Sequence, residues 1–155
     1  MAQLYVDDGV KNRGHRTNMI NPRFKQIGIA YCYHRKYKAM LVMVYASDFT
    51  PAESVESVRN NFEEVLTDHT FQDPYQSIEQ AAFDYQNKIR TDSRRIAKTV
   101  GRKVWGDAFY ALRRQEKLPA FVWSDGLARA AQDHCNDIGP RGKSQHEGTD
   151  GSMPE

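Results

Sequence analysis

Two histidines in polar, glycine-containing segments are the first candidates for chemistry in this sequence. His15 lies within residues 7–18 (DDGVKNRGHRTN), and His146 lies within residues 144–151 (SQHEGTDG). A neutral imidazole can ligate a metal ion or move a proton near neutral pH. A histidine in a loop is nevertheless most often an ordinary surface residue. The two segments therefore become a site only if the fold brings their side chains to one cleft.

The two histidines could share a metal ion such as zinc through neutral imidazoles, although these supply no charge to compensate it. Carboxylate ligands would also be needed, and Asp7 and Asp8 are the acids close to His15 in the sequence. The spacing of Cys32 and Cys135 fits no zinc motif. We therefore expect no resident cofactor, and at most weak zinc binding by His15 and His146.

Catalysis by either histidine would require an aligned nucleophile or a metal-bound water. Ser144 is close to His146 in the sequence, but no nucleophile motif surrounds it. We therefore predict that the protein is not an enzyme. A weak metal-dependent hydrolase is the less favoured alternative.

A run of basic residues forms a third candidate. Arg94, Lys98 and Arg102 are spaced four residues apart, with Arg95 and Lys103 beside them. Such a stripe could meet anionic lipid, nucleic acid or an acidic protein surface, and a plain solvated helix face is the simpler interpretation. No aromatic platform or nucleic-acid motif accompanies it, so we predict no nucleic-acid partner.

These candidates must be positioned by one domain of ordinary size. The chain has 155 residues, and its 11% aromatic content is enough for a folded core. Residues 1–50 carry a net charge of +5 and residues 51–90 a net charge of −5. This asymmetry suggests either two segments that face each other or an asymmetric docking surface.

The compartment is predicted from segments that would target or anchor the chain. No signal peptide is visible at the start, and the longest apolar run, residues 39–46, is too short to span a bilayer. We therefore expect no transmembrane segment and a location in the cytoplasm or an intracellular assembly. Cys32 and Cys135 are too few for a disulfide scaffold, so two buried free thiols are expected, with one disulfide as the alternative.

The hydrophobic pattern predicts an α+β fold. Residues 27–33 and 39–46 read as an antiparallel hairpin, and residues 51–67 as a helix capped at Thr50. Helical periodicity continues from residue 78 and, interrupted by glycines, through residues 92–117. Ser124 caps a further helix, whose buried face should include Leu127, Ala131, His134 and Ile138. The tail, residues 141–155, reads as a loop.

A long motif in the first segment carries a resemblance to a known family. The motif is VDDGVKNRGHRTNMINPRFKQIGIA, residues 6–30. It resembles the second half of the CAP superfamily domain, which is found in cysteine-rich secretory proteins, antigen 5 and pathogenesis-related 1 proteins. The shared pattern is His-Arg-x-Asn, a hydrophobic pair, Pro, Phe, then Ile-Gly and a strand.

The first half of the same domain is similar to residues 78–155. The matching positions are Asn87 and Arg90, the helix around Trp123 and Leu127, and the His146 loop. The halves therefore occur in reversed order: residues 1–49, a helix and linker at 50–77, then residues 78–155. A circular permutation would explain this order. So would a chain that spans the end of one domain and the start of the next, either as a truncated product or as a piece completed by partners. The family's central Gly-Glu-Asn motif, whose Glu joins the two histidines, is missing, and Asp7 and Asp8 are weak substitutes for that Glu.

The resemblance implies an αβα sandwich with an antiparallel sheet and a cleft that contains His15, His146, Arg16 and Asn18. It also implies sterol or lipid binding, a divalent metal, or protein recognition, and an extracellular location as the alternative compartment. We therefore predict a non-catalytic module that binds lipid, a small ligand or a protein. The alternative is a structural component packed into a larger assembly.

Overall fold

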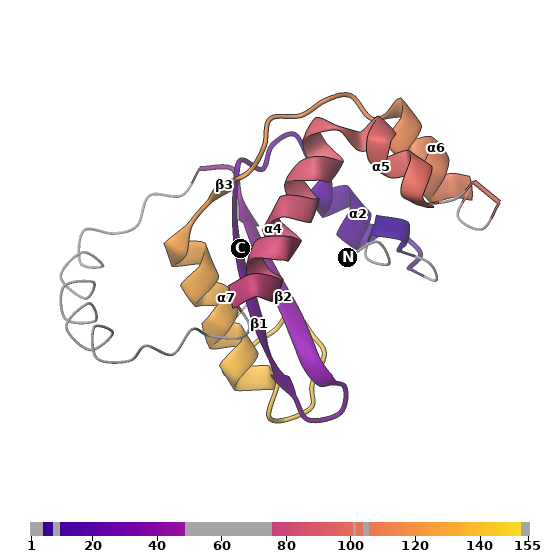
Figure 1. Cartoon of the computed structure of the whole chain (residues 1–155). Coiled ribbons are helices and arrows are strands. Elements are labelled where there is room, and N and C mark those ends of the chain that lie inside the picture. The colour runs from indigo at the N-terminus through magenta and orange to yellow at the C-terminus, as the bar shows by residue number, and fades with distance from the viewer. Residues whose placement is uncertain (1–4, 8–9, 49–75, 101, 104–105, 153–155) are drawn as a thin grey trace.

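The computed structural model of the chain describes residues 5–7, 10–48, 76–100, 102–103 and 106–152. The helix predicted at residues 51–67 lies outside these residues. The described part contains helices and a small three-stranded sheet, so the predicted α+β class is confirmed (Figure 1). The helices are α2 (Gly14–Met19), α4 (Gln76–Thr91), α5 (Ser93–Val100), α6 (Gly106–Arg114) and α7 (Asp125–Ile138).

The sheet is built on the predicted hairpin, which is confirmed. β1 (Gln26–His34) pairs antiparallel with β2 (Lys38–Ala46) over their whole length. β3 (Val122–Trp123) pairs in parallel with the start of β1, which gives the strand order β2-β1-β3. The sheet is therefore mixed, whereas the hydrophobic pattern predicted an antiparallel one. The two-residue β3 has no periodicity from which its pairing could be predicted.

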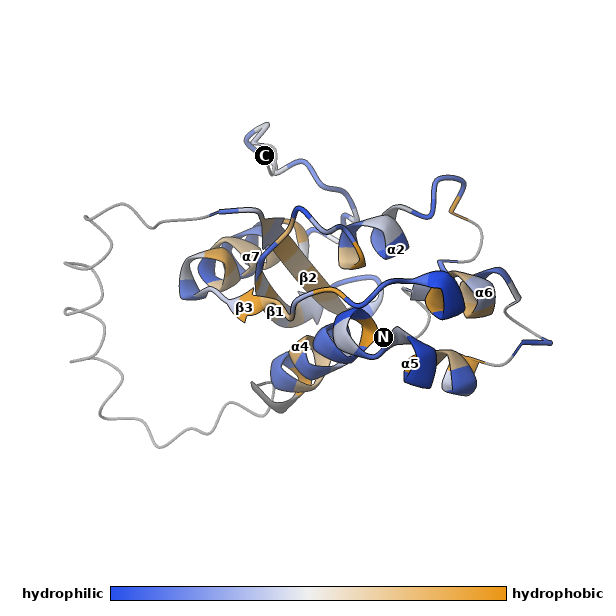
Figure 2. Ribbon diagram, turned by 90° about the horizontal axis from the view of Figure 1, so that it is seen from above, coloured by the Kyte–Doolittle hydropathy of each residue, from blue (hydrophilic) through white to orange (hydrophobic). Residues whose placement is uncertain are grey.

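Helices cover the sheet on both faces, as in an αβα sandwich (Figure 2). Alternate residues of β1 point to opposite sides. Ala30 packs on one side with Ala131 and Cys135 of α7, whereas Ile29 packs on the other side in a cluster that contains Ala82 of α4. Gly28 lets α7 approach closely, since a Cβ there would overlap the backbone of residues 127–128. β1 thus packs against α4, from the middle of the chain, and against α7, from its C-terminal part.

A disulfide between Cys32 and Cys135, which are 103 positions apart in the sequence, links β1 to α7. The expectation of two free thiols was wrong. Small residues such as Gly28 and Ala30 bring the strand and helix together, so the two Cα atoms lie 6.0 Å apart, a normal spacing for a bridge. Residue count alone could not show that the fold pairs these two positions.

Arg90 connects α4 to the loops at the top of the sheet. The side chain is almost completely buried and stacks on Phe121, with its guanidinium carbon 3.9 Å from the ring centroid. It donates hydrogen bonds to the backbone carbonyls of Met19, Asn21, Phe24 and Pro119. One turn earlier, Asn87 exchanges hydrogen bonds with the backbone of Phe121. The Asn87 and Arg90 positions of the family pattern thus have a structural role here.

The segment at residues 92–117 forms two short helices, α5 and α6, as its internal glycines suggested. Both helices pack on a separate core cluster that includes Tyr5, Met19 and Ile89. Ser124 caps α7 as predicted, because its side chain accepts a hydrogen bond from the Leu127 backbone N–H. His134 is not a core residue, however. Its side chain is partly exposed, and Nε2 lies 3.1 Å from the Gln145 carbonyl oxygen. The next residue, Cys135, is the one that α7 buries against the sheet.

Candidate functional site

A buried carboxylate and a half-exposed imidazole form the most ordered polar arrangement near α2. The Asp7 carboxylate accepts a hydrogen bond from the His15 backbone N–H at 3.0 Å. It also contacts His15 Nδ1 at 2.7 Å. The Asp7 side chain is 2% exposed and the His15 side chain 47% exposed. A carboxylate acceptor favours the proton on Nδ1, so the Nε2 lone pair is directed away from Asp7.

Two arginines hold this pair against the rest of the molecule. Arg16 is buried and donates to the backbone carbonyls of Tyr5 and Val6. Arg13 donates to the Asp7 carbonyl, and both arginines form ion pairs with Asp107 of α6. Arg16, predicted to line the cleft, therefore acts mainly as a structural clamp between residues 5–7, α2 and α6.

Two titratable groups close to Arg16, Asp107 and Tyr5, have shifted pKa values. Desolvation raises the pKa of Asp107. The hydrogen bond from the Ala108 backbone N–H and the charges of Arg16 and Arg13 outweigh this effect, so the pKa of Asp107 is below its usual value. Burial raises the pKa of Tyr5 to about 12, although nearby Arg16 acts in the opposite direction. Asp107 thus stays ionised and Tyr5 neutral over the physiological range.

His146 occupies a different environment. It is exposed, in a loop shaped by Asp137, which accepts hydrogen bonds from the backbone N–H and hydroxyl of Thr149. These hydrogen bonds lower the pKa of Asp137. Buried His34 attaches the β1–β2 turn to the same tail, since its Nε2 lies 2.9 Å from the Lys143 carbonyl. Asn18 is exposed on α2.

The described residues provide no complete metal site. No three His, Cys, Asp or Glu side chains among them are grouped so that they could hold a metal ion. Asp7 and His15 are in contact with each other. Because no group of three such side chains exists among the described residues, His146 is not a third ligand beside them. The sequence offered Asp7 and Asp8 only as weak substitutes for a carboxylate ligand. Asp8 lies outside the described residues, and the Asp7 carboxylate contacts His15 and orients its ring.

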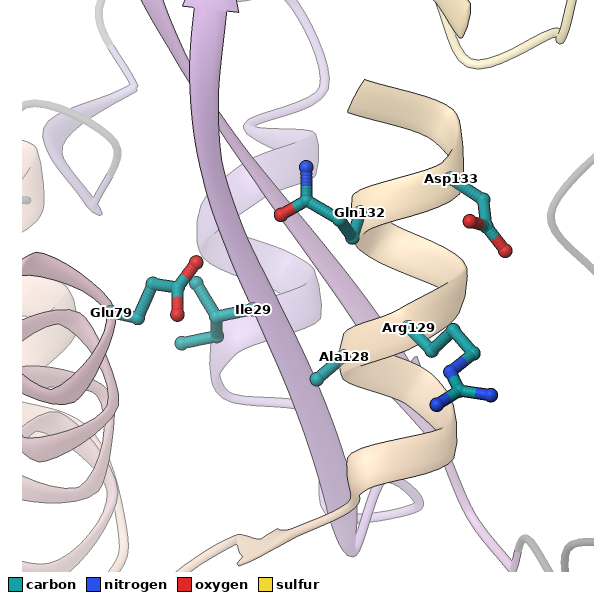
Figure 3. Close-up of a pocket in the computed structure, with 6 residues that line it drawn as sticks. All are labelled: Ile29, Glu79, Ala128, Arg129, Gln132 and Asp133. Carbon is teal, nitrogen blue, oxygen red and sulfur yellow. The ribbon is translucent and has the colours of Figure 1, made fainter. Parts of the chain in front are cut away.

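A pocket of about 430 Å³ lies elsewhere, beside β1 between α4 and α7 (Figure 3). Glu79 of α4 reaches across to accept a hydrogen bond from the Tyr31 backbone N–H at 2.8 Å. None of the predicted site residues lines this pocket. Its lining residues are Ile29, Glu79, Ala128, Arg129, Gln132 and Asp133.

Comparison with known families decides what kind of domain carries these features. The chain matches the profile of the cysteine-rich secretory protein family, CAP, over residues 1–45 and 83–154. It belongs to the CAP family. No match was found among curated proteins or solved structures. The first matched segment of this CAP domain contains the β1–β2 hairpin, and the second contains α7. Among the described residues, no helix is long and apolar enough to span a membrane.

Sequence reasoning missed two polar groups of this CAP domain. Asp107 was not singled out, because nothing in its sequence context indicates that α6 returns to α2. His34 was not singled out either, because its local sequence does not indicate that its ring meets the distant Lys143 carbonyl. Both contacts join residues about 90 or more positions apart, which local patterns do not reveal.

Proposed function

We propose that this chain is a non-catalytic CAP module that binds a lipid, a small ligand or a protein partner at the surface around His15. The observation that carries the proposal is the 2.7 Å contact between His15 Nδ1 and the buried Asp7 carboxylate. A carboxylate that contacts one ring nitrogen in this way fixes both the tautomer and the orientation of the imidazole. The half-exposed ring can then offer Nε2 as one directed acceptor.

Recognition is a better use of this geometry than catalysis. In the described part of the chain, His15 makes hydrogen bonds to Asp7 alone, and no hydroxyl or thiol is aligned with it. A directed lone pair suits a ligand hydroxyl, such as that of a sterol, or an N–H group of a partner. It also suits a single bond to zinc, which would be weak without further ligands.

The order and compartment of the domain form part of the same proposal. A circular permutation accounts for the reversed segments, and it is supported by the packing of β1 on α7. The Cys32–Cys135 disulfide favours the extracellular alternative, since disulfides persist mainly in oxidising compartments.

NMR titration of the labelled protein tests the His15 surface. Zinc chloride and a cholesterol–cyclodextrin complex are added separately, and the backbone signals of α2 are followed with the His15 side-chain nitrogens. We expect at least one probe to shift these signals, and His15→Gln to abolish the shifts. His134→Gln, which changes a partly exposed histidine on α7, should leave them intact. Equal shifts in wild type and His15→Gln, or none in α2, would leave a purely structural role as the better account.

A further inference from the structure

Helices α5 and α6 lie side by side at one end of the molecule, away from the β1–β2 turn (Figures 1 and 2). Their apolar faces are already used in the core: Ile96, Ala97 and Val100 of α5 pack with Ala108 and Leu112 of α6. The outer side of this pair is therefore polar. We refer to the exposed basic residues of this region as the α5–α6 surface: Arg94, Arg95, Lys98, Arg102, Lys103, Arg113, Arg114 and Lys117.

Positive charge on this surface is poorly compensated. Residues 92–117 contain eight lysines and arginines but three acids, a net charge of +5. One of the acids, Asp107, is occupied by Arg13 and Arg16 from the neighbouring segment. Within the described residues, no ion pair engages any member of the α5–α6 surface. The surface therefore projects a positive field toward solvent.

The arrangement of the charges suits a linear polyanion. Arg94 and Lys98 lie one helical turn apart, about 6 Å along the axis, and Arg102 continues the same spacing in the sequence. On α6, the Arg114 guanidinium carbon lies 6.0 Å from the centroid of the Tyr110 ring, which is 46% exposed. An aromatic face beside cations adds an apolar contact to charge recognition.

We propose that the α5–α6 surface binds a sulfated polysaccharide. Five of its eight cations are arginines, whose planar guanidinium groups form paired hydrogen bonds with tetrahedral oxyanions. The Cys32–Cys135 disulfide favours the extracellular compartment, where sulfated glycans rather than cytosolic nucleic acids are available. Insertion into a bilayer is disfavoured, because the apolar faces of both helices are buried. This surface is separate from His15, so the proposal does not depend on the binding function proposed above.

The test compares two triple variants of equal net charge by heparin-affinity chromatography and by titration with a heparin oligosaccharide. Arg94→Gln/Arg95→Gln/Lys98→Gln removes charge from α5. Arg35→Gln/Lys36→Gln/Lys38→Gln removes the same charge from the β1–β2 turn. We expect the α5 variant to bind about tenfold more weakly, with a shallower salt dependence, because counterion release scales with the contacts made. The β1–β2 turn variant should stay close to wild type on heparin.

Two further measurements keep each outcome decisive. The triple variant Arg113→Gln/Arg114→Gln/Lys117→Gln, at the end of α6 and just after it, should also weaken heparin binding, and it replaces the α5 variant if that one fails to fold. Sedimentation with vesicles of phosphatidylcholine and phosphatidylserine examines a membrane as the rival partner. Equal weakening by the α5 and turn variants would overturn the proposal. It would also be overturned if the α5 variant lost vesicle binding while its heparin affinity stayed at the wild-type value.

Discussion

At the scale of single residues, Gly28 sets the distance between β1 and α7. A Cβ at this position would overlap the backbone of Leu127 and Ala128, so neither side can yield without moving a main chain. Gly28→Ala should therefore lower the free energy of unfolding by about 1–3 kcal/mol. Urea unfolding measures the change, with Gly106→Ala as control, because no atom lies within 4 Å of its new Cβ. Similar unfolding midpoints for the two variants would contradict the tight contact.

Tyr5 provides a pH-dependent prediction. Its hydroxyl is buried, and no hydrogen-bond partner for it occurs among the described residues. Burial raises the pKa of Tyr5 from about 10 to about 12, so the unfolded state ionises first as the pH rises. The contribution of Tyr5 to stability is thus complete below pH 10 and is lost as the pH rises to 12.

Tyr5→Phe should consequently be neutral or slightly stabilising at pH 7, since it removes a buried polar group without a partner. At pH 11 it should unfold at a higher urea concentration than the wild type. Tyr37→Phe, at an exposed ring, is the control. If Tyr5→Phe were destabilising at pH 7, the hydroxyl would have to make a hydrogen bond that the described contacts lack.

At the scale of elements, Arg90 determines how α4 meets the loops around residues 19–24 and 119–121. Arg90→Ala would leave four backbone carbonyls without their donor and should cost about 3–4 kcal/mol of unfolding free energy. Arg90→Lys should recover little, because an ammonium group cannot reproduce the guanidinium geometry. Lys88→Ala, at an exposed position of the same helix, serves as control in thermal unfolding. Equal melting temperatures for Arg90→Ala and Lys88→Ala would contradict this role.

Elements were predictable where their hydrophobic pattern is local. The alternation of residues 27–33 and the apolar run at 39–46 identified the hairpin, and the Ser124 cap identified the start of α7. The parallel pairing of β3 and the Asp107 ion pairs were not predictable, since they join residues far apart in the sequence. At the site, the sequence identified His15 but not the way in which Asp7 orients it, because the spacing of eight residues matches no motif.

At the scale of the whole molecule, the Cys32–Cys135 disulfide closes a loop of about a hundred residues and joins the two CAP-matching segments. Replacing both cysteines, Cys32→Ser/Cys135→Ser, should lower the free energy of unfolding by about 2–4 kcal/mol, through loss of the constraint on the unfolded chain. Urea unfolding of this variant and of the wild type in a reducing agent should agree. A reducing agent should change the midpoint of the wild type but leave that of the double variant unchanged. Equal stability of the oxidised and reduced wild type would contradict this contribution.

The central claim is that both CAP-matching segments of one chain build a single domain. Non-reducing gel electrophoresis with intact-mass measurement of the purified protein tests it most directly. We predict a monomer of 17.8 kDa, lighter than its reduced form by the two thiol hydrogens, with Cys32 and Cys135 recovered in one disulfide-linked peptide pair. A disulfide-linked dimer that becomes a monomer on reduction would show that the segments are completed by a second chain. Two free thiols would contradict the Cys32–Cys135 disulfide between β1 and α7.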